Sequence, residues 1–245
     1  MSVAMAARTS RRVLNQLRHD PRSVVLVLFL PAVLLAVLYF MFDGRAARFD
    51  RVALIMLGVL PFVVMFLITS IAMLRERTGG TLERLLSTPL GRADLLFGYA
   101  GAFAGVAAAQ ACIAVAAAYW LFGLSTAGPA GLVVLVAVAD ALLGVGLGLL
   151  CSAFARSEFQ AVQFLPVVVI PQLFVCGLFV PRDQMAGWLD GFSRAMPMTY
   201  AVQSLQQIGV HPGATSLMWR DVVIVGGCAL VALCLAAVTV RRASR

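Results

Sequence analysis

Lysine is absent from this sequence, and all 19 basic residues are arginine. A phosphate-binding P-loop needs a lysine after its glycines, so the chain cannot bind a nucleotide through that motif. Schiff-base catalysis needs a lysine amine and is excluded as well. Charge is also scarce, because charged residues make up 12% of the chain against about 25% in soluble domains. The composition argues against a soluble globular protein.

Hydrophobic residues make up 62% of the 245 positions, and the mean hydropathy is +0.96. A membrane-spanning helix needs about 20 apolar residues. Six runs of the sequence meet this requirement, at about residues 23–42, 52–74, 96–124, 131–154, 159–180 and 222–240. We expect Pro166 and Pro171 to break the fifth run, and the first 22 residues are too polar for a cleavable signal peptide. The predicted fold class is an all-α membrane protein with six transmembrane helices.

The arginines predict the orientation of these spans, because positive charge collects on the cytoplasmic side. With a cytoplasmic N-terminus, six of the 19 arginines lie outside, namely Arg45, Arg48, Arg51, Arg182, Arg194 and Arg220. The remaining 13 lie in the cytoplasm, and both termini are cytoplasmic. Aromatic rings settle near membrane interfaces, and five of them fall near the outer one: Tyr39, Tyr119, Trp120, Trp188 and Trp219. The net charge of +8 then serves mainly to orient the spans and to face the lipid, and we expect no nucleic-acid partner.

Residues that could carry out chemistry are few. The two histidines, His19 and His211, fall on opposite sides of the predicted membrane and cannot form one site. The five cysteines lie in or at the ends of spans, without metal-ligand spacing: Cys112, Cys151, Cys176, Cys228 and Cys234. We interpret them as small buried hydrophobes. The sequence predicts no enzyme and no metal site.

The segment RERTGGTLERLLSTPLGR, residues 75–92, is a charged interruption between the second and third spans. The glycines at 79–80 should end the second span, Thr81 can cap a new helix, and Glu83 suits its positive end. The apolar face of that helix would consist of Leu82, Leu85 and Leu86. Pro89 should stop it. We favour a short amphipathic docking helix over a solvated loop that only sets topology.

Residues 1–22 predict a second amphipathic helix, lying in the interface on the cytoplasmic side. One face would carry Val3, Ala6, Ala7, Val13, Leu14 and Leu17. The other would carry Arg8, Arg11, Arg12, Asn15, Arg18 and His19.

Asp140 lies about ten residues inside the fourth span, where an ionisable group costs at least ~2.5 kcal/mol. It could contact a cationic substrate. Alternatively, its carboxyl could be protonated or satisfied by Gln110, Gln163 or a backbone group, and we favour this interpretation. Asp140, Gln110, Gln163 and Gln172 are the candidate residues of a substrate pathway.

Two stretches of this chain resemble a known family. ERTGGTLERLLSTP follows the second span, and GLFVPRDQMAGWLDGFSRAMPMTYAVQSLQQI, residues 177–208, precedes the last one. Together with the N-terminal helix and the six spans, they are similar to the type-2 ABC exporter permeases. The resemblance covers the whole chain and is greatest to daunorubicin-resistance permeases.

The resemblance implies that residues 75–95 are a coupling loop that docks into a separate ABC ATPase subunit. The polar contacts would be Glu76, Arg77, Glu83 and Arg84, and the three leucines would form the apolar seat. ATP and Mg²⁺ would bind on the ATPase, and this chain would carry no cofactor. The implied location is the inner membrane of a bacterial cell.

A second permease chain, identical or related, is also implied, because six spans form half of a pathway. Glycines four residues apart allow close helix contact, and two such pairs occur, Gly101/Gly105 and Gly144/Gly148. They could serve packing between the two chains or packing within one chain.

The outer segment 181–208 is implied to form re-entrant helices that cap the exit of the pathway. Residues 182–199 should dip into the outer interface without crossing the membrane. The residues expected in this cap are Trp188, Leu189, Phe192, Pro197, Thr199 and Tyr200.

The function expected is export of amphipathic drugs or lipid-like compounds. Within the same class, polysaccharide or lipid precursors remain alternatives. An ion-coupled secondary transporter would need several ionisable residues inside the membrane and usually an internal repeat. A membrane-embedded enzyme would need a paired nucleophile and base.

Overall fold

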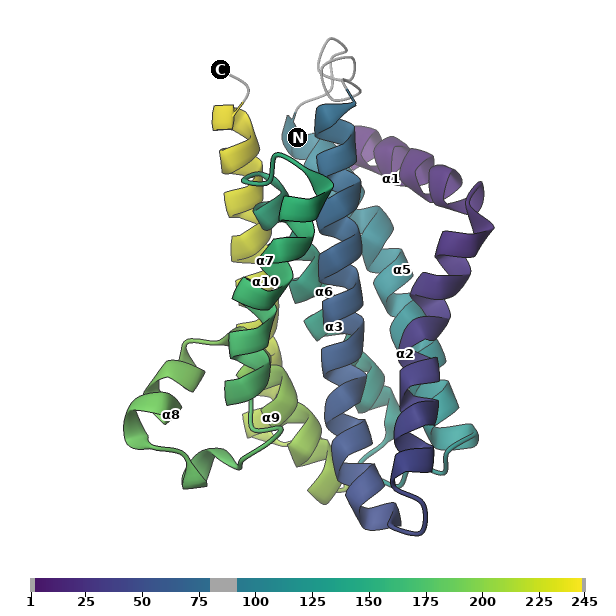
Figure 1. Ribbon diagram of the computed structural model, residues 1–245, viewed down its shortest axis with the longest axis vertical. Helices are drawn as coiled ribbons and strands as arrows, with labels where there is room; N and C mark the ends of the chain where they lie inside the picture. The colour runs from purple at the N-terminus through teal and green to yellow at the C-terminus, as the bar shows by residue number, and fades with distance from the viewer. Residues whose placement is uncertain (1–2, 80–91, 244–245) are drawn as a thin grey trace.

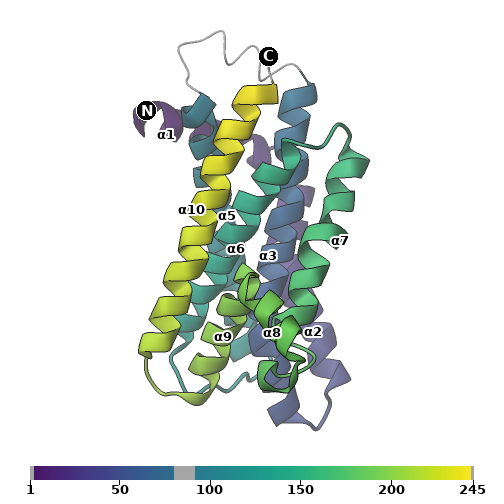
Figure 2. The ribbon, with the colours of Figure 1, turned by 90° about the vertical axis from the view of Figure 1, so that its left-hand side faces the viewer.

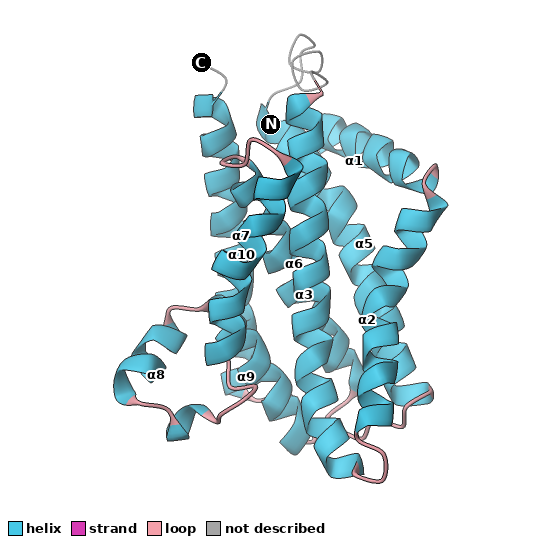
Figure 3. Cartoon of the chain, in the orientation of Figure 1, coloured by secondary structure: helices cyan, strands magenta, loops and turns pink. Residues whose placement is uncertain are grey.

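A computed structural model describes residues 3–79 and 92–243, and these residues form an all-helical bundle (Figures 1 and 3). The helices are α1 (Val3–Arg18), α2 (Pro21–Met41), α3 (Ala46–Thr78), α5 (Arg92–Trp120), α6 (Ala130–Ser152), α7 (Glu158–Val175), the 3₁₀ turn η1 (Arg182–Gln184), α8 (Gly187–Arg194), α9 (Pro197–Val210) and α10 (Ser216–Ala243).

Six helices in the described ranges are long and apolar enough to cross a membrane, namely α2, α3, α5, α6, α7 and α10. They match the six predicted spans, with ends that differ by a few residues. The largest difference is α3, whose 33 residues extend about 50 Å and therefore project beyond a hydrocarbon core of about 30 Å. Gly44, with φ +70°, makes the turn before α3, and Gly79 follows its last residue.

The two ends of the bundle carry different short helices, α1 at one end and α8 at the other, as the side view in Figure 2 shows. At one end, called here the α1 end, lie α1 and the last turn of α10. At the other, the α8 end, lie α8 and the turns that join α2 to α3, α5 to α6 and α9 to α10. An even number of spans accounts for this, because α1 and the last described turn of α10 must then share one end.

The centre of the bundle is the contact between α3 and α6, and glycine makes it close. A Cβ added at Gly144 or Gly148 would lie under 3.0 Å from the carbonyl oxygens of Phe62 or Phe66 on α3. The Gly144/Gly148 pair therefore serves packing within the chain. Gly101 also packs inside the chain, since its position faces Ser10 of α1, whereas Gly105 has open space beside it.

The expected break in the fifth span is wrong. α7 runs without interruption from Glu158 to Val175 and includes both Pro166 and Pro171. Each proline removes only one N–H from the helix, and membrane helices tolerate this where neighbours or local adjustments satisfy the freed backbone group. A full break would leave more backbone groups unsatisfied in lipid.

Residues 182–199 contain no membrane-spanning helix, because η1 and α8 are three and eight residues long. α9 has 14 residues and a length of about 21 Å, which is too short to cross the hydrocarbon core. It starts beside the last turn of α7, where the Met198 N–H donates to Gln172 Oε1 at 3.4 Å. It ends at the α8 end, where Ile208 O accepts from the Gly128 N–H at 2.9 Å.

Candidate functional site

A polar cluster at the α1 end joins three helices. Arg12 of α1 donates to Glu76 Oε1 of α3 at 3.0 Å and to the Tyr99 hydroxyl of α5 at 3.1 Å. Tyr99 in turn donates to Glu76. Close by, Ser10 Oγ of α1 donates to the Gly98 carbonyl of α5 at 2.6 Å. Because the Glu76 side chain is only 11% exposed, it serves contacts within the bundle.

The last turn of α3 is also tied to the far side of the bundle. Arg75 makes a two-pronged ion pair with Glu158 at the start of α7, with N–O distances of 2.8 and 2.9 Å. Arg77 donates to the Ser152 carbonyl at the end of α6. The helix end that enters the 80–91 segment is thus tied to α1, α5, α6 and α7.

These contacts show where two of the expected coupling residues lie. Glu76 and Arg77 both bind groups of their own chain. The other expected coupling residues lie outside the described residues, namely Thr81, Leu82, Glu83, Arg84, Leu85 and Leu86. Their docking role stays a prediction.

Asp140 is fully buried in the middle of α6. Its carboxyl faces Gly58 of α3, where an added Cβ would lie 3.5 Å from Oδ2. Neither of its oxygens has a hydrogen-bond partner among the described residues. The expectation that Gln110, Gln163 or a backbone group satisfies it is therefore wrong.

The other residues of the expected pathway are not hydrogen-bonded to Asp140. Gln110 is buried and donates to the Val27 carbonyl of α2. Gln172 donates to the Val168 carbonyl at 2.9 Å and accepts from Met198. Gln163 is exposed on α7. Their role in a substrate pathway stays a prediction.

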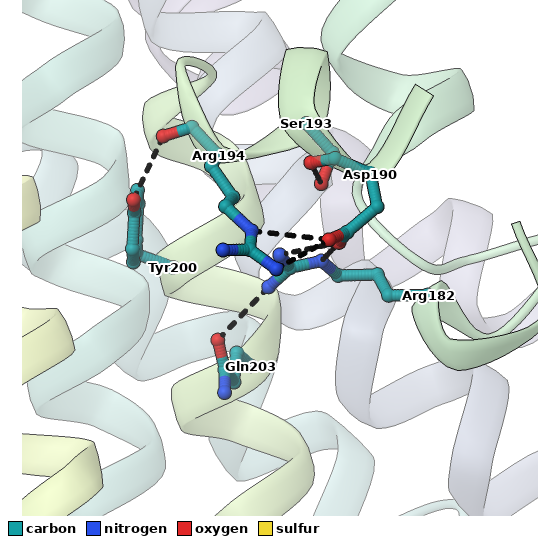
Figure 4. Close-up of polar contacts among 6 residues, drawn as sticks. All are labelled: Arg182, Asp190, Ser193, Arg194, Tyr200 and Gln203. Atoms are coloured by element: carbon teal, nitrogen blue, oxygen red, sulfur yellow. Dashed lines mark hydrogen bonds and ion pairs between the residues drawn. The ribbon is translucent and has the colours of Figure 1, made fainter. Parts of the chain in front are cut away.

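A second polar cluster holds the short helices of the α8 end together (Figure 4). Asp190 binds Arg182 at 2.8 Å and Arg194 at 2.6 Å. Arg182 also donates to Gln203 of α9 at 3.2 Å, and Tyr200 donates to the Arg194 carbonyl at 2.7 Å. The hydrogen bonds from Arg194 and Arg182 lower the pKa of Asp190 below its ordinary value.

The cap residues occupy different environments in this region. Trp188 and Phe192 are exposed, at 76% and 43%, Leu189 is half-buried, and Pro197 begins α9. Thr199 is fully buried, and its Oγ1 has no partner in the part of the chain that the structure describes. Because Trp188 and Phe192 are exposed, the apolar face of α8 points outward, as an interfacial helix requires. A pocket of about 740 Å³ lies between α3, α9 and the chain around Arg182.

Sequence reasoning missed the contacts that build both clusters. Arg12 was placed among the polar residues on one face of its helix, yet it contacts Glu76 across 64 positions. No contact was predicted between Asp190 and Arg194, although they are four residues apart on one helix. That spacing predicts an ion pair, so local pattern could have identified the pair at the α8 end but not the pair at the α1 end.

Six membrane-length helices, an amphipathic helix at one end and a short-helix cap at the other define a multi-pass membrane protein. The ABC-2 type transporter family model matches residues 4–209, and the chain belongs to this family.

Named relatives agree with this assignment. The chain is 27% identical over 166 residues to the probable multidrug ABC transporter permease YbhR of Escherichia coli, covering 68% of this chain and 45% of that protein. It is 30% identical over 135 residues to the linearmycin resistance permease protein LnrN of Bacillus subtilis, covering 55% of this chain and 35% of that protein. The chain thus spans less than half the length of these relatives.

Proposed function

We propose that this chain is the membrane permease of an ATP-driven exporter and that a separate ATPase subunit powers it. The family match over residues 4–209 carries the proposal. Relatives named as multidrug and linearmycin resistance permeases favour amphipathic, drug-like or lipid-like cargo. The 245 residues of this chain contain no lysine and therefore no P-loop, so the ATP-binding site must lie outside them.

The orientation that we propose places the α1 end in the cytoplasm of a bacterial cell, with the chain in the inner membrane. The distribution of arginines supports it, because the six of the predicted outer side all lie at the α8 end, in loops, in short helices or in the first turns of α3 and α10.

The ATPase docks, on this proposal, at the α1 end against residues 80–91. Glu83 and Arg84 make polar contacts, and the leucines at 82, 85 and 86 form the apolar seat. The contacts of Glu76 and Arg77 with their own bundle suggest a different role for these two residues. They hold the base of the docking segment and transfer its movement to α1 and α6.

A second permease chain, identical or related, completes the pathway on this proposal. The helices α2, α7 and α10 leave most of their apolar surface exposed, so they are available to lipid and to a second chain.

The experiment combines pull-down of the ATPase with an export assay in cells. Leu85→Asp places a charge in the apolar seat and should abolish export and reduce recovery of the ATPase. Charge reversal of Glu83 or Arg84 should weaken both, because a mismatched charge misdirects docking. The matched control is Leu121→Asp, since Leu121 is 74% exposed just after α5 at the α8 end. Normal export and pull-down by all three docking variants would contradict the proposed docking site.

One observation favours a second function, an ion-coupled carrier. Asp140 is a buried carboxyl without a partner among the described residues. Proton-coupled carriers use carboxyls inside the membrane to bind and release protons. Export that follows an imposed proton gradient and needs no ATP would select this alternative.

A further inference from the structure

A groove of about 490 Å³ lies beneath α1, between that helix and α2, α3 and α5. Its interior is apolar and is lined by Val24, Val27, Leu28, Ile68, Phe103 and Val106. The side of the groove formed by α5 has free space at Gly105, because a Cβ added there would meet nothing within 4 Å. From Phe103 to Ala109 the groove follows α5 for about 9 Å, more than half of the ~15 Å depth of one leaflet.

The mouth of the groove is cationic. Arg11, Asn15 and Arg18 line it. A neighbouring surface pocket shares Arg11 and Asn15 and adds Arg8, Arg12 and His19. No carboxylate belongs to the described residues that line either pocket. Among the described residues, the ion pairs involve Arg12 but none of Arg8, Arg11 and Arg18.

We propose that this groove binds one anionic phospholipid. The phosphate of its headgroup lies against Arg11 and Arg18, and the upper part of one acyl chain fills the apolar interior. The position fits this ligand, because the turn at Asp20 and Pro21 sets α1 across the membrane end of α2. The arginines then stand at headgroup depth, above an apolar channel.

Charge and shape together select this ligand over others. A cationic drug would be repelled by the arginines, and a free phosphate would leave the apolar interior uncovered. A zwitterionic lipid fills the interior but brings no net charge to the mouth. Arginine near a membrane surface contributes about 1 kcal/mol of attraction to anionic lipid, which is about five-fold in affinity. The proposal does not depend on what the chain transports.

The test measures lipid binding to the full-length permease in detergent by native mass spectrometry. The probes are phosphatidylglycerol and phosphatidylcholine with the same acyl chains, and glycerol phosphate as a free headgroup. We expect phosphatidylglycerol to bind at one site per chain with a clear preference. Arg11→Gln and Arg18→Gln should each weaken binding about five-fold. Gly105→Leu should remove it by filling the groove.

Two variants control for charge and for side-chain volume. Arg48→Gln removes one exposed arginine at the α8 end, and Gly227→Leu adds the same side chain at an open, exposed position of α10. Both should bind phosphatidylglycerol like the original chain. Thermal unfolding without added lipid shows whether each variant is folded, and Gly105→Leu should unfold no earlier than Gly227→Leu.

Three results would overturn the proposal. The first is equal binding of the two lipids. The second is displacement of phosphatidylglycerol by an equal concentration of glycerol phosphate, which would show a site for the headgroup alone. The third is full binding by folded Gly105→Leu or by the double variant of Arg11 and Arg18.

Discussion

The ion pair between Arg12 and Glu76 should stabilise the folded permease more than an exposed ion pair does. The perturbation is a double-mutant cycle, in which each residue is changed to alanine alone and both are changed together. Hydrogen bonds to charged groups contribute about 1.5–3 kcal/mol, whereas exposed pairs contribute about 0.2–1 kcal/mol. The Glu76 side chain is 11% exposed and that of Arg12 is 33% exposed. We therefore expect a coupling energy near the lower end of the first range, about 1.5 kcal/mol.

A second pair in the same chain serves as the control. Arg75 and Glu158 are 2.8 Å apart but 66% and 53% exposed, so their coupling energy should be about 0.5 kcal/mol. The assay is unfolding of the full-length chain in mixed micelles, followed by circular dichroism, with the free energy of unfolding obtained for all members of both cycles. A coupling energy for Arg12 and Glu76 no larger than that of the exposed pair would refute the reasoning. It would mean that the contact between α1 and α3 is not a fixed connection.

Three further outcomes are expected. Gly148→Leu should lower the free energy of unfolding by roughly 1–3 kcal/mol or more, because its Cβ would overlap the Phe66 carbonyl oxygen; thermal unfolding equal to that of Gly227→Leu would contradict this. The pKa of Asp190 is depressed by its arginine partners, so their stabilisation should be complete above about pH 4 and lost as the pH falls through the depressed pKa. Melting curves of the original chain and Asp190→Asn should converge in acid, and a constant difference would argue against the ion pairs. Single cysteines placed at Ser87 and Asp190 in a cysteine-free chain should be labelled from opposite sides of the membrane, and labelling from one side would refute the proposed topology.

The six spans could be predicted because length and hydropathy are local properties of the sequence. The break expected at Pro166 and Pro171 failed because a single missing N–H costs less in lipid than an interrupted helix. The end of α3 at Gly79 was predicted correctly, since the glycine pair marks it within the sequence.

The candidate site was less predictable, because its contacts join distant parts of the chain. Arg12 and Glu76 are 64 positions apart, and no local spacing connects them. A partner was expected for Asp140 because buried carboxyls usually have one, but its carboxyl faces Gly58, which has no side chain to donate, and it has no partner among the described residues. The role of Gly144 in packing within one chain also depends on which helix faces it, and only the fold decides this.

ATP-dependent transport by the reconstituted complex tests the central claim most directly. The permease and its ATPase are placed in proteoliposomes, and uptake of a fluorescent amphipathic drug is followed after ATP reaches the α1 side. Uptake should require both subunits, and an ATPase variant that cannot hydrolyse ATP should abolish it. Uptake by the permease alone, or uptake driven by a proton gradient without ATP, would contradict the account.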